Sequence, residues 1–222
     1  MGDNILTMIK VIELPIDKDM GGLTSYVLQL YRMIDKKEFE LTLLSYDDPQ
    51  NFDVNYNVET VSRPYHIIQF YKKMKCLLSE GKDIIHFHQS YVNIIPILIA
   101  KLAGFKTIIL HAHSSSIDDN RKIVRFLKTG LHKVGRFLLP YLVDTYIGCS
   151  TKASEWMFPR KCIDSDSYYL LHNAIDLDLY DRNINLGLEV RQKFNIPKDA
   201  LVVGHIGRFT PVKNHPFIID IF

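Results

Sequence analysis

The chain has 222 residues, enough to bury a sizeable core, and its 47% hydrophobic and 23% charged residues are typical of a globular protein rather than a disordered one. Its 27 basic and 25 acidic side chains leave a formal net charge of only +2, so nothing in the totals indicates a nucleic-acid binder. The three cysteines, Cys76, Cys149 and Cys162, lack Cys-x-x-Cys spacing, which argues against a zinc site or a disulfide framework and favours a reducing, cytoplasmic setting.

No segment has the pattern of a signal peptide or a transmembrane helix. The first apolar run of the chain is interrupted by Glu13 and Pro15. The longest apolar stretch elsewhere, Tyr91–Ala100, contains Pro96 and is far shorter than the roughly 20 residues that a transmembrane helix needs. We therefore expect any membrane contact to be peripheral, at the inner face of the cell membrane.

Short apolar runs rich in β-branched residues alternate along the chain with longer segments of helical period. Leu23–Ile34 and Tyr65–Leu78 place apolar residues three or four positions apart, which predicts two helices with one buried face each. Such alternation is typical of an α/β fold with a mostly parallel sheet covered on both faces. The predicted strands are Ile9–Leu14, Phe39–Ser45, Val58–Ser62, Asp83–Phe87, Thr107–His111, Thr145–Cys149, Tyr168–Leu171 and Leu201–Ile206.

The periodic pattern loosens from Asn173 to Asp199, where charges, Gly187 and Pro197 interrupt it. The apolar run Leu201–Ile206 then reads as a new buried strand, followed by a helix that begins near Lys213. We therefore predict one domain with its linker over residues 1–199 and the start of a second domain, not completed, over residues 200–222.

The first candidate site is Gly21-Gly22, which follows the first predicted strand and begins the first predicted helix. Paired glycines allow close approach of the backbone to a ligand, and the free N–H groups of a helix N-terminus favour phosphate. A tight turn without a ligand explains the glycines as well. The full Gly-x-Gly-x-x-Gly and Walker A patterns are absent, so a dinucleotide or P-loop site loses its main support.

The second candidate site is His111-Ala112-His113, at the carboxyl end of a predicted parallel strand, where open α/β sheets place their ligands. Strand alternation puts both imidazoles on one side. The pair is compatible with substrate contact, with a core histidine hydrogen-bonded to backbone, or with metal binding. Because the nearby sequence offers only Asp118 and Asp119 as carboxylates, we expect no metal here.

The segment from Asn120 to Pro140 predicts a basic amphipathic helix. One interpretation is a surface for an anionic membrane or a lipid-phosphate acceptor, and the other is a solvated helix whose apolar stripe belongs to the core. The basic residues are Arg121, Lys122, Arg125, Lys128, Lys133 and Arg136, and the stripe is Ile123, Leu127, Leu131, Val134 and Leu138.

The most specific signal lies between Gly204 and His215. A predicted strand ends in Gly207-Arg208, a turn with Pro211 follows, and Lys213 stands at the next predicted helix. Two cations five residues apart across such a turn can converge on one diphosphate, with assistance from the helix dipole.

Together these motifs resemble GT-B glycosyltransferases of family 4, particularly the bacterial capsule and exopolysaccharide members. The resemblance covers essentially the whole chain. It depends on Gly21-Gly22, His111–Ser114, Cys149–Phe158, His172–Asp176, Gly207-Arg208 and Lys213–His215, in the order and spacing of the family.

The resemblance implies a Rossmann-like parallel sheet for the first domain and a second, incomplete Rossmann-like domain. It also implies a retaining transfer of sugar from a nucleotide-diphosphate donor to a polysaccharide or lipid-linked acceptor, with no cofactor and no required metal. By match, Arg208, Lys213 and His113 are the catalytic residues, and Gly21, Gly22, Asn173, Arg208 and Lys213 bind the donor. Contact with the acceptor or the membrane is expected of His111, Arg121, Lys122, Arg125 and Lys128.

The chain departs from the family pattern in two ways. Ala174 stands where the family usually has glycine, and the acidic motif that holds the donor's sugar and ribose is absent. An alternative hypothesis is therefore a non-catalytic remnant that keeps only acceptor or membrane binding. A dehydrogenase-like nucleotide binder needs a third glycine after Gly22 and an acidic residue at the end of the second strand, and the sequence has neither.

Overall fold

The computed structural model describes residues 8–19, 21–119, 121–177, 184–207, 209 and 213–221, with residues 184 and 185 described in their backbone only. The chain divides into two compact units, Met1–Ile175 and Asp176–Phe222, which we describe separately. The domain border expected between residues 199 and 200 stays a prediction.

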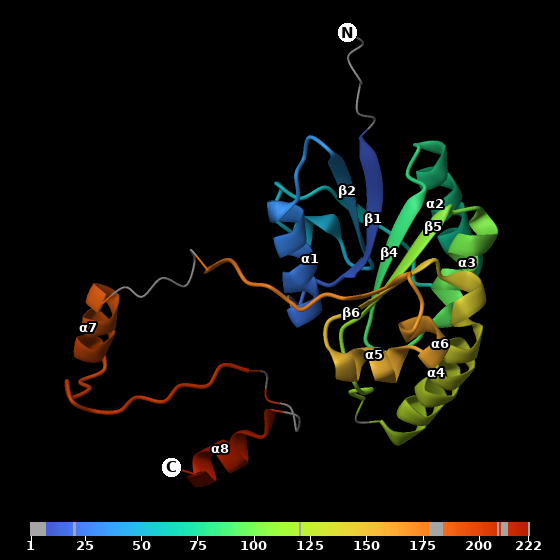
Figure 1. Ribbon diagram of the computed structural model, residues 1–222. Coiled ribbons are helices and arrows are strands. Elements are labelled where there is room, and N and C mark those ends of the chain that lie inside the picture. The colour runs from blue at the N-terminus through green and yellow to red at the C-terminus, as the bar shows by residue number, and fades with distance from the viewer. Residues whose placement is uncertain are drawn as a thin grey trace. The chain divides into compact units, whose positions relative to one another are not determined.

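The first unit is built on a seven-stranded sheet in the order β3-β2-β1-β4-β5-β6-β7, in which every neighbouring pair is parallel (Figure 1). This confirms the predicted Rossmann-like α/β fold. The chain leaves β1 toward one edge and returns to β4 on its other side, so the strand order reverses between β1 and β4. The strands are β1 Ile9–Ile16, β2 Phe39–Ser45, β3 Val58–Thr60, β4 Ile84–Gln89, β5 Thr107–Ala112, β6 Thr145–Gly148 and β7 Tyr168–Leu170.

Helices cover the two faces of this sheet unequally. Helix α1 lies on one side, while α2, α3 and α4 follow one another on the other side, with α3 packed between α2 and α4 (Figure 1). The two helices predicted from apolar spacing are confirmed as α1 and α2. The helices of this unit are α1 Gly22–Met33, α2 Ile67–Ser79, α3 Ile94–Ala103, α4 Lys122–Leu142, α5 Thr151–Met157 and α6 Arg160–Ile163, with a 3-10 turn, η1, at Pro49–Asn51.

The alternation of side chains along the strands divides the interior into two cores. Leu44 joins the large apolar core beneath α2 and α3, whereas its neighbour Leu43 joins the smaller one beneath α1. In β1, β4 and β5 the residues Ile12, Phe87 and Leu110 belong to the large core. The residues next to these along each strand must therefore point to the α1 face, and several of them are polar.

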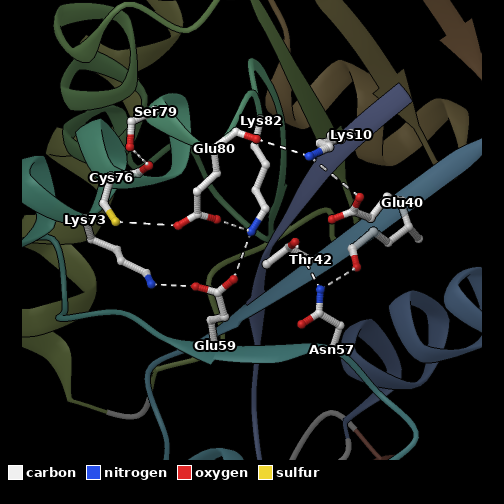
Figure 2. A network of polar contacts seen from close by, with 11 residues as sticks. Lys10, Glu40, Thr42, Asn57, Glu59, Lys73, Cys76, Ser79, Glu80 and Lys82 are labelled. Carbon is white, nitrogen blue, oxygen red and sulfur yellow. Dashed lines mark hydrogen bonds and ion pairs between the residues drawn. The ribbon is translucent and has the colours of Figure 1, made fainter. Parts of the chain in front are cut away.

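Figure 2 shows a charged network centred on Lys82, which lies two residues before β4 and is 5% exposed. Its Nζ lies 2.9 Å from Glu59 Oε1 and 2.7 Å from Glu80 Oε2. The second oxygen of Glu59, on β3, pairs with Lys73 Nζ of α2 at 2.5 Å. A buried ammonium is stable only when paired, so this network links β3 to α2 and to the start of β4.

The second unit contains helices α7 Ile184–Lys193 and α8 His215–Ile221 in its described residues. The prediction of a strand at Leu201–Ile206 is wrong for this chain, because residues 201–207 form no strand. A strand requires a hydrogen-bonded neighbour, and the described part of this unit offers none. Leu201, Val203 and Ile206 are correspondingly exposed.

Among the described residues, no helix combines the length and apolar character needed to cross a bilayer.

Candidate functional site: a glutamate and histidine cluster at the carboxyl ends of the central strands

Five polar side chains from three adjacent strands gather on the α1 face of the sheet. Glu13 of β1 is paired in register with His86 of β4, and His88 is paired with His111 of β5. His113 is the first residue after β5. Since these positions alternate with core residues, the side chains share one face, at the carboxyl ends of strands next to the reversal of strand order. This is where open α/β sheets place their ligands.

Hydrogen bonds connect the cluster in a defined order. Glu13 Oε2 accepts from His88 Nε2 at 2.5 Å and from His86 Nδ1 at 3.0 Å. The other nitrogen of His88, Nδ1, lies 2.8 Å from Nε2 of His113. Glu13 and His88 are each 1% exposed, whereas His113 is half-buried. A continuous contact therefore runs from a buried carboxylate to a ring that reaches the surface of the unit.

Burial and mutual charge determine the protonation of these groups. Burial by itself would raise the pKa of Glu13, but the charge of His86 and hydrogen bonds from His86 and His88 outweigh it and hold the pKa at about 2. Burial lowers the pKa of His88 to about 4 and, together with the neighbouring rings, lowers the pKa of His113 to about 2. At neutral pH the site therefore contains the carboxylate of Glu13 and uncharged imidazoles at His88 and His113.

His111 occupies the centre of the cluster and is fully buried. Neither of its ring nitrogens has a hydrogen-bond partner, and burial and the adjacent histidines lower its pKa far below the ordinary value. Its ring is stacked on His86 at 5.5 Å, and Tyr26 of α1 meets its edge at 5.2 Å. The contacts of this imidazole are therefore with aromatic rings rather than with hydrogen-bonding groups. The acceptor-contact role expected for His111 stays a prediction, and its burial in this unit argues against direct contact.

Among the residues that the structure describes, His86, His88 and His111 form the group best placed to hold a metal, with ligand nitrogens within 4.8 Å of one another. Glu13 would supply an anionic fourth ligand. However, the carboxylate is already satisfied by two imidazole N–H groups, one of them at 2.5 Å. Coordination of a metal through Glu13 Oε2 would therefore compete with these hydrogen bonds.

A cavity of about 230 Å³ opens beside His88. Two tyrosines and several polar side chains face it, a combination suited to the apolar faces and hydroxyl groups of a sugar. Burial and the charge of Asp47 raise the pKa of Asp17, one of these polar groups. The lining residues are Pro15, Asp17, Leu23, Tyr46, Phe87, His88, Gln89, Ser90, Tyr91, Asn93 and Pro96.

The structure places Gly21 and Gly22 at the first turn of α1, as the sequence predicts. Gly21 is the residue that caps the helix, in extended conformation and without a side-chain hydrogen bond. A Cβ at either glycine would meet nothing within 4 Å. The two glycines are therefore not required by close packing among the described residues, and binding of phosphate at this helix end stays a prediction.

The predicted basic amphipathic helix is α4. Leu131 and Leu138 pack against the large core, so the core interpretation holds for that part of the stripe. Ile123, Leu127 and Val134 are instead 77%, 63% and 60% exposed. The exposed stripe also includes Phe126, Phe137 and Tyr141.

Two of the cations expected to meet an acceptor or membrane are already paired. Asp119 binds Arg121 Nε at 3.1 Å and Lys128 Nζ at 2.9 Å, and these contacts hold the pKa of its carboxyl well below the usual range. Lys122 and Arg125 are exposed on the first turns of α4.

The remaining predicted site residues are Asn173, Arg208 and Lys213. Asn173 is exposed beyond β7, in the first unit. Lys213 belongs to the second unit, where it is exposed, and its Cγ would lie 3.3 Å from a Cβ added at Gly207. Arg208 lies outside the described residues. The convergence of Arg208 and Lys213 on a diphosphate therefore stays a prediction.

Sequence reasoning missed Glu13, His86, His88 and Tyr26. The signal was present in Ile84-Ile-His-Phe-His-Gln89, where two histidines alternate with core residues just as His111 and His113 do. Glu13 was equally visible as an acid inside an apolar strand. Only the pairing of β1 with β4, however, brings that acid to the histidines.

Comparisons with known proteins agree with this architecture. Residues 20–179, more than half of the chain, match the family described as Glycosyltransferase Family 4. EpsF of Bacillus subtilis (strain 168), a protein named as a glycosyltransferase, is 25% identical over 230 residues, covering 96% of this chain and 57% of EpsF. The UDP-Gal:alpha-D-GlcNAc-diphosphoundecaprenol alpha-1,3-galactosyltransferase of Escherichia coli is 21% identical, covering 93% of this chain and 55% of the relative. The chain thus spans little more than half the length of these relatives.

Solved structures share the fold at low sequence identity. MurG of Acinetobacter baumannii is similar with a TM-score of 0.50 and 12% identity, over 75% of this chain and 46% of MurG. MnaA of S. aureus, solved with UDP, has a TM-score of 0.50 and 15% identity, over 85% of this chain and 50% of MnaA. At these identities the likeness concerns the fold alone.

Proposed function

The chain belongs to glycosyltransferase family 4, and from this we propose that it takes part in a retaining sugar transfer from a nucleotide-diphosphate donor to a polysaccharide or lipid-linked acceptor. The observation that carries the proposal is the position of His113. The ring stands at the carboxyl end of β5, next to the reversal of strand order, and is supported from within by His88. By family resemblance, this histidine would contact the transferred sugar.

On the donor side we propose that Arg208 and Lys213 bind the diphosphate. Their positive charges would offset the negative charge that develops on the leaving nucleotide, the task that a metal performs in other transferases. Gly21 and Gly22 would offer backbone N–H groups to the phosphates, and Asn173 would face the same ligand. In this scheme residues 1–199 form the acceptor-side domain and residues 200–222 belong to a donor-binding domain.

On the acceptor side we propose that the cavity beside His88 holds a sugar. Tyr46 and Tyr91 offer aromatic faces, and Asp17 and Gln89 offer hydrogen-bonding groups. Replacement of Tyr91 by alanine should therefore raise the KM for the acceptor more than that for the donor.

We propose that helix α4 holds the protein at the inner, cytoplasmic face of the membrane. Its exposed apolar stripe lies beside exposed cations, including Lys122 and Arg125. This is the chemistry that an anionic bilayer surface attracts. The E. coli relative is named for a diphosphoundecaprenol-linked acceptor, which supports a lipid-linked acceptor for this chain as well.

A second candidate is a non-catalytic protein that keeps only acceptor or membrane binding. The same exposed stripe of α4 favours it, because membrane attachment requires neither Arg208 nor Lys213. The two candidates differ in what they predict for nucleotide-sugar donors.

The deciding experiment is a binding and hydrolysis screen of the chain against UDP-, GDP- and ADP-sugars. Arg208→Ala and Lys213→Ala should each abolish saturable binding, since each removes one cation from the proposed diphosphate site. Lys198→Ala, which removes an exposed lysine of the same unit outside the motif, is the matched control and should bind like the wild type. Absence of binding to every donor would favour the non-catalytic candidate.

A further inference from the structure

A chain of three side chains leads from a buried anion to the half-buried ring of His113. Glu13 is the anion, and its Oε2 lies 2.5 Å from Nε2 of His88. On the far side of that ring, His88 Nδ1 lies 2.8 Å from Nε2 of His113. Both distances are those of strong hydrogen bonds, so each must contain one proton.

The positions of these protons follow from what each group can donate. A carboxylate only accepts, so the proton between Glu13 and His88 belongs to His88 Nε2. A neutral imidazole carries a single N–H, which leaves His88 Nδ1 as an acceptor. The proton in the second contact therefore belongs to His113 Nε2. By the same rule, Nδ1 of His113 keeps its lone pair.

We propose that Glu13 and His88 are positioning residues that lock His113 in the Nε2–H tautomer and thereby make its Nδ1 an acceptor for a substrate hydroxyl. The proposal rests on the proposed function, in which His113 meets the substrate. It narrows the ligand group to one that donates a hydrogen bond, such as a sugar hydroxyl. A phosphate or carboxylate oxygen, which only accepts, would be repelled by the lone pair.

The surroundings of the relay preserve this arrangement. Glu13 and His88 are almost wholly buried, so water does not reach their side chains to replace either hydrogen bond. His86 donates from Nδ1 to the same carboxylate oxygen, at 3.0 Å, and so holds the anion in place from a second side. Carboxylate–histidine pairs orient imidazoles in this way in enzyme active sites generally.

The test begins with the wild-type protein and needs no variant. Long-range ¹H–¹⁵N NMR of the labelled full chain distinguishes the protonated from the unprotonated nitrogen of each imidazole. We expect both His88 and His113 to carry their proton on Nε2 at neutral pH. A proton on His113 Nδ1 would overturn the proposal, as would a metal ion retained at one per chain on a His88 nitrogen.

Two substitutions of Glu13 separate the relay from mere packing. Glu13→Met has nearly the shape of glutamate but no strong acceptor, so nothing holds the proton of His88 on Nε2. The inverted tautomer of His113, with its proton on Nδ1, should then appear. Glu13→Gln retains a side-chain carbonyl that can accept from the N–H groups of both His86 and His88, so the wild-type tautomer should persist. His111→Leu is the control, because it removes a buried ring of the same cluster that makes no hydrogen bond. An unchanged tautomer in Glu13→Met would overturn the proposal.

The kinetic part of the test applies once a donor and acceptor pair is turned over. Glu13→Met should lower kcat by about tenfold or more, with partial recovery in Glu13→Gln, because His113 can no longer accept from the substrate hydroxyl. Full kcat in Glu13→Met with an inverted tautomer would overturn the proposal. Absence of turnover with every pair, while the tautomers are as expected, would instead overturn the proposed function and leave the relay intact.

Discussion

His132 of α4 lies flat against Trp156 of α5, with ring centroids 4.2 Å apart and planes 15° from parallel. Its Nδ1 accepts a hydrogen bond of 3.0 Å from the backbone N–H of Val92, and Trp156 Nε1 donates to the carbonyl of Ser90 at 3.1 Å. The stacked pair therefore fixes the segment between β4 and α3. Because Ser90 and Tyr91 line the cavity beside His88, this support also shapes the candidate acceptor site.

The first prediction concerns this histidine and pH. Burial lowers the pKa of His132 to about 4, whereas the unfolded chain binds a proton near pH 6.5. The folding free energy contributed by neutral His132 is therefore present above pH 6.5 and lost as pH falls toward 4, by roughly 1 to 3 kcal/mol. His132→Asn keeps an acceptor near the Nδ1 position but does not titrate.

Urea unfolding of both proteins at several pH values is the measurement. The wild type should be the more stable at pH 7, and its advantage over His132→Asn should shrink as pH falls from 7 to 4. A constant difference across this range would show that His132 titrates alike in the folded and unfolded states.

The second prediction compares two glycines of the same helix. A Cβ at Gly135 would stand 2.5 Å from Cγ1 of Val92, whereas a Cβ at Gly130 would meet nothing within 4 Å. Gly135→Ala should therefore destabilise the protein by about 1 to 3 kcal/mol through overpacking. Gly130→Ala should stabilise it by roughly 0.5 to 1 kcal/mol through helix propensity. Equal effects in thermal unfolding would show that the contact between α4 and Val92 is not as close as the structure has it.

The sequence predicts the fold of the first unit well because its strands are short, apolar and separated by amphipathic helices. The bounds of Phe39–Ser45 agree to the residue, and α1 and α2 differ from their predictions by only one or two residues. The strand expected at Leu201–Ile206 failed for a physical reason. Apolar, β-branched composition favours a strand, but pairing with a neighbour is what forms one.

The candidate site was predictable only in part. His111 and His113 follow from their place at a strand end, but the environment of His113 depends on β1 and β4, which are distant in sequence. No local pattern indicates that Glu13 accepts from His88, because this contact joins residues 75 positions apart. Pairing order in the sheet decides it.

The third prediction tests the charged network of Figure 2. Lys82→Met removes a buried ammonium and leaves Glu59 and Glu80 without a shared partner, so it should cost about 2 to 4 kcal/mol. Glu59→Gln should also destabilise, since Lys82 then keeps a single carboxylate. In the double variant the two losses should not add, with a coupling of roughly 1 to 3 kcal/mol in a urea-unfolding cycle. Additive losses would mean that Lys82 and Glu59 do not interact in the folded protein.

The fourth prediction concerns the exposed stripe of α4 and a membrane surface. Phe126 and Phe137 are 79% and 70% exposed, and burial of two such rings in a bilayer interface is worth roughly 2 to 4 kcal/mol. Phe126→Ser with Phe137→Ser should therefore weaken binding to vesicles of anionic lipid by about 30-fold or more in a sedimentation assay.

Ile68→Ser is the control for this experiment, since Ile68 is 68% exposed on α2 and lies outside the stripe. It should leave vesicle binding unchanged. Lys122→Gln and Arg125→Gln should each weaken binding by about 1 kcal/mol, and only at low salt, because the attraction between these cations and the lipid headgroups is screened by ions. If the double serine variant binds vesicles as tightly as the wild type, α4 is not the membrane-facing surface.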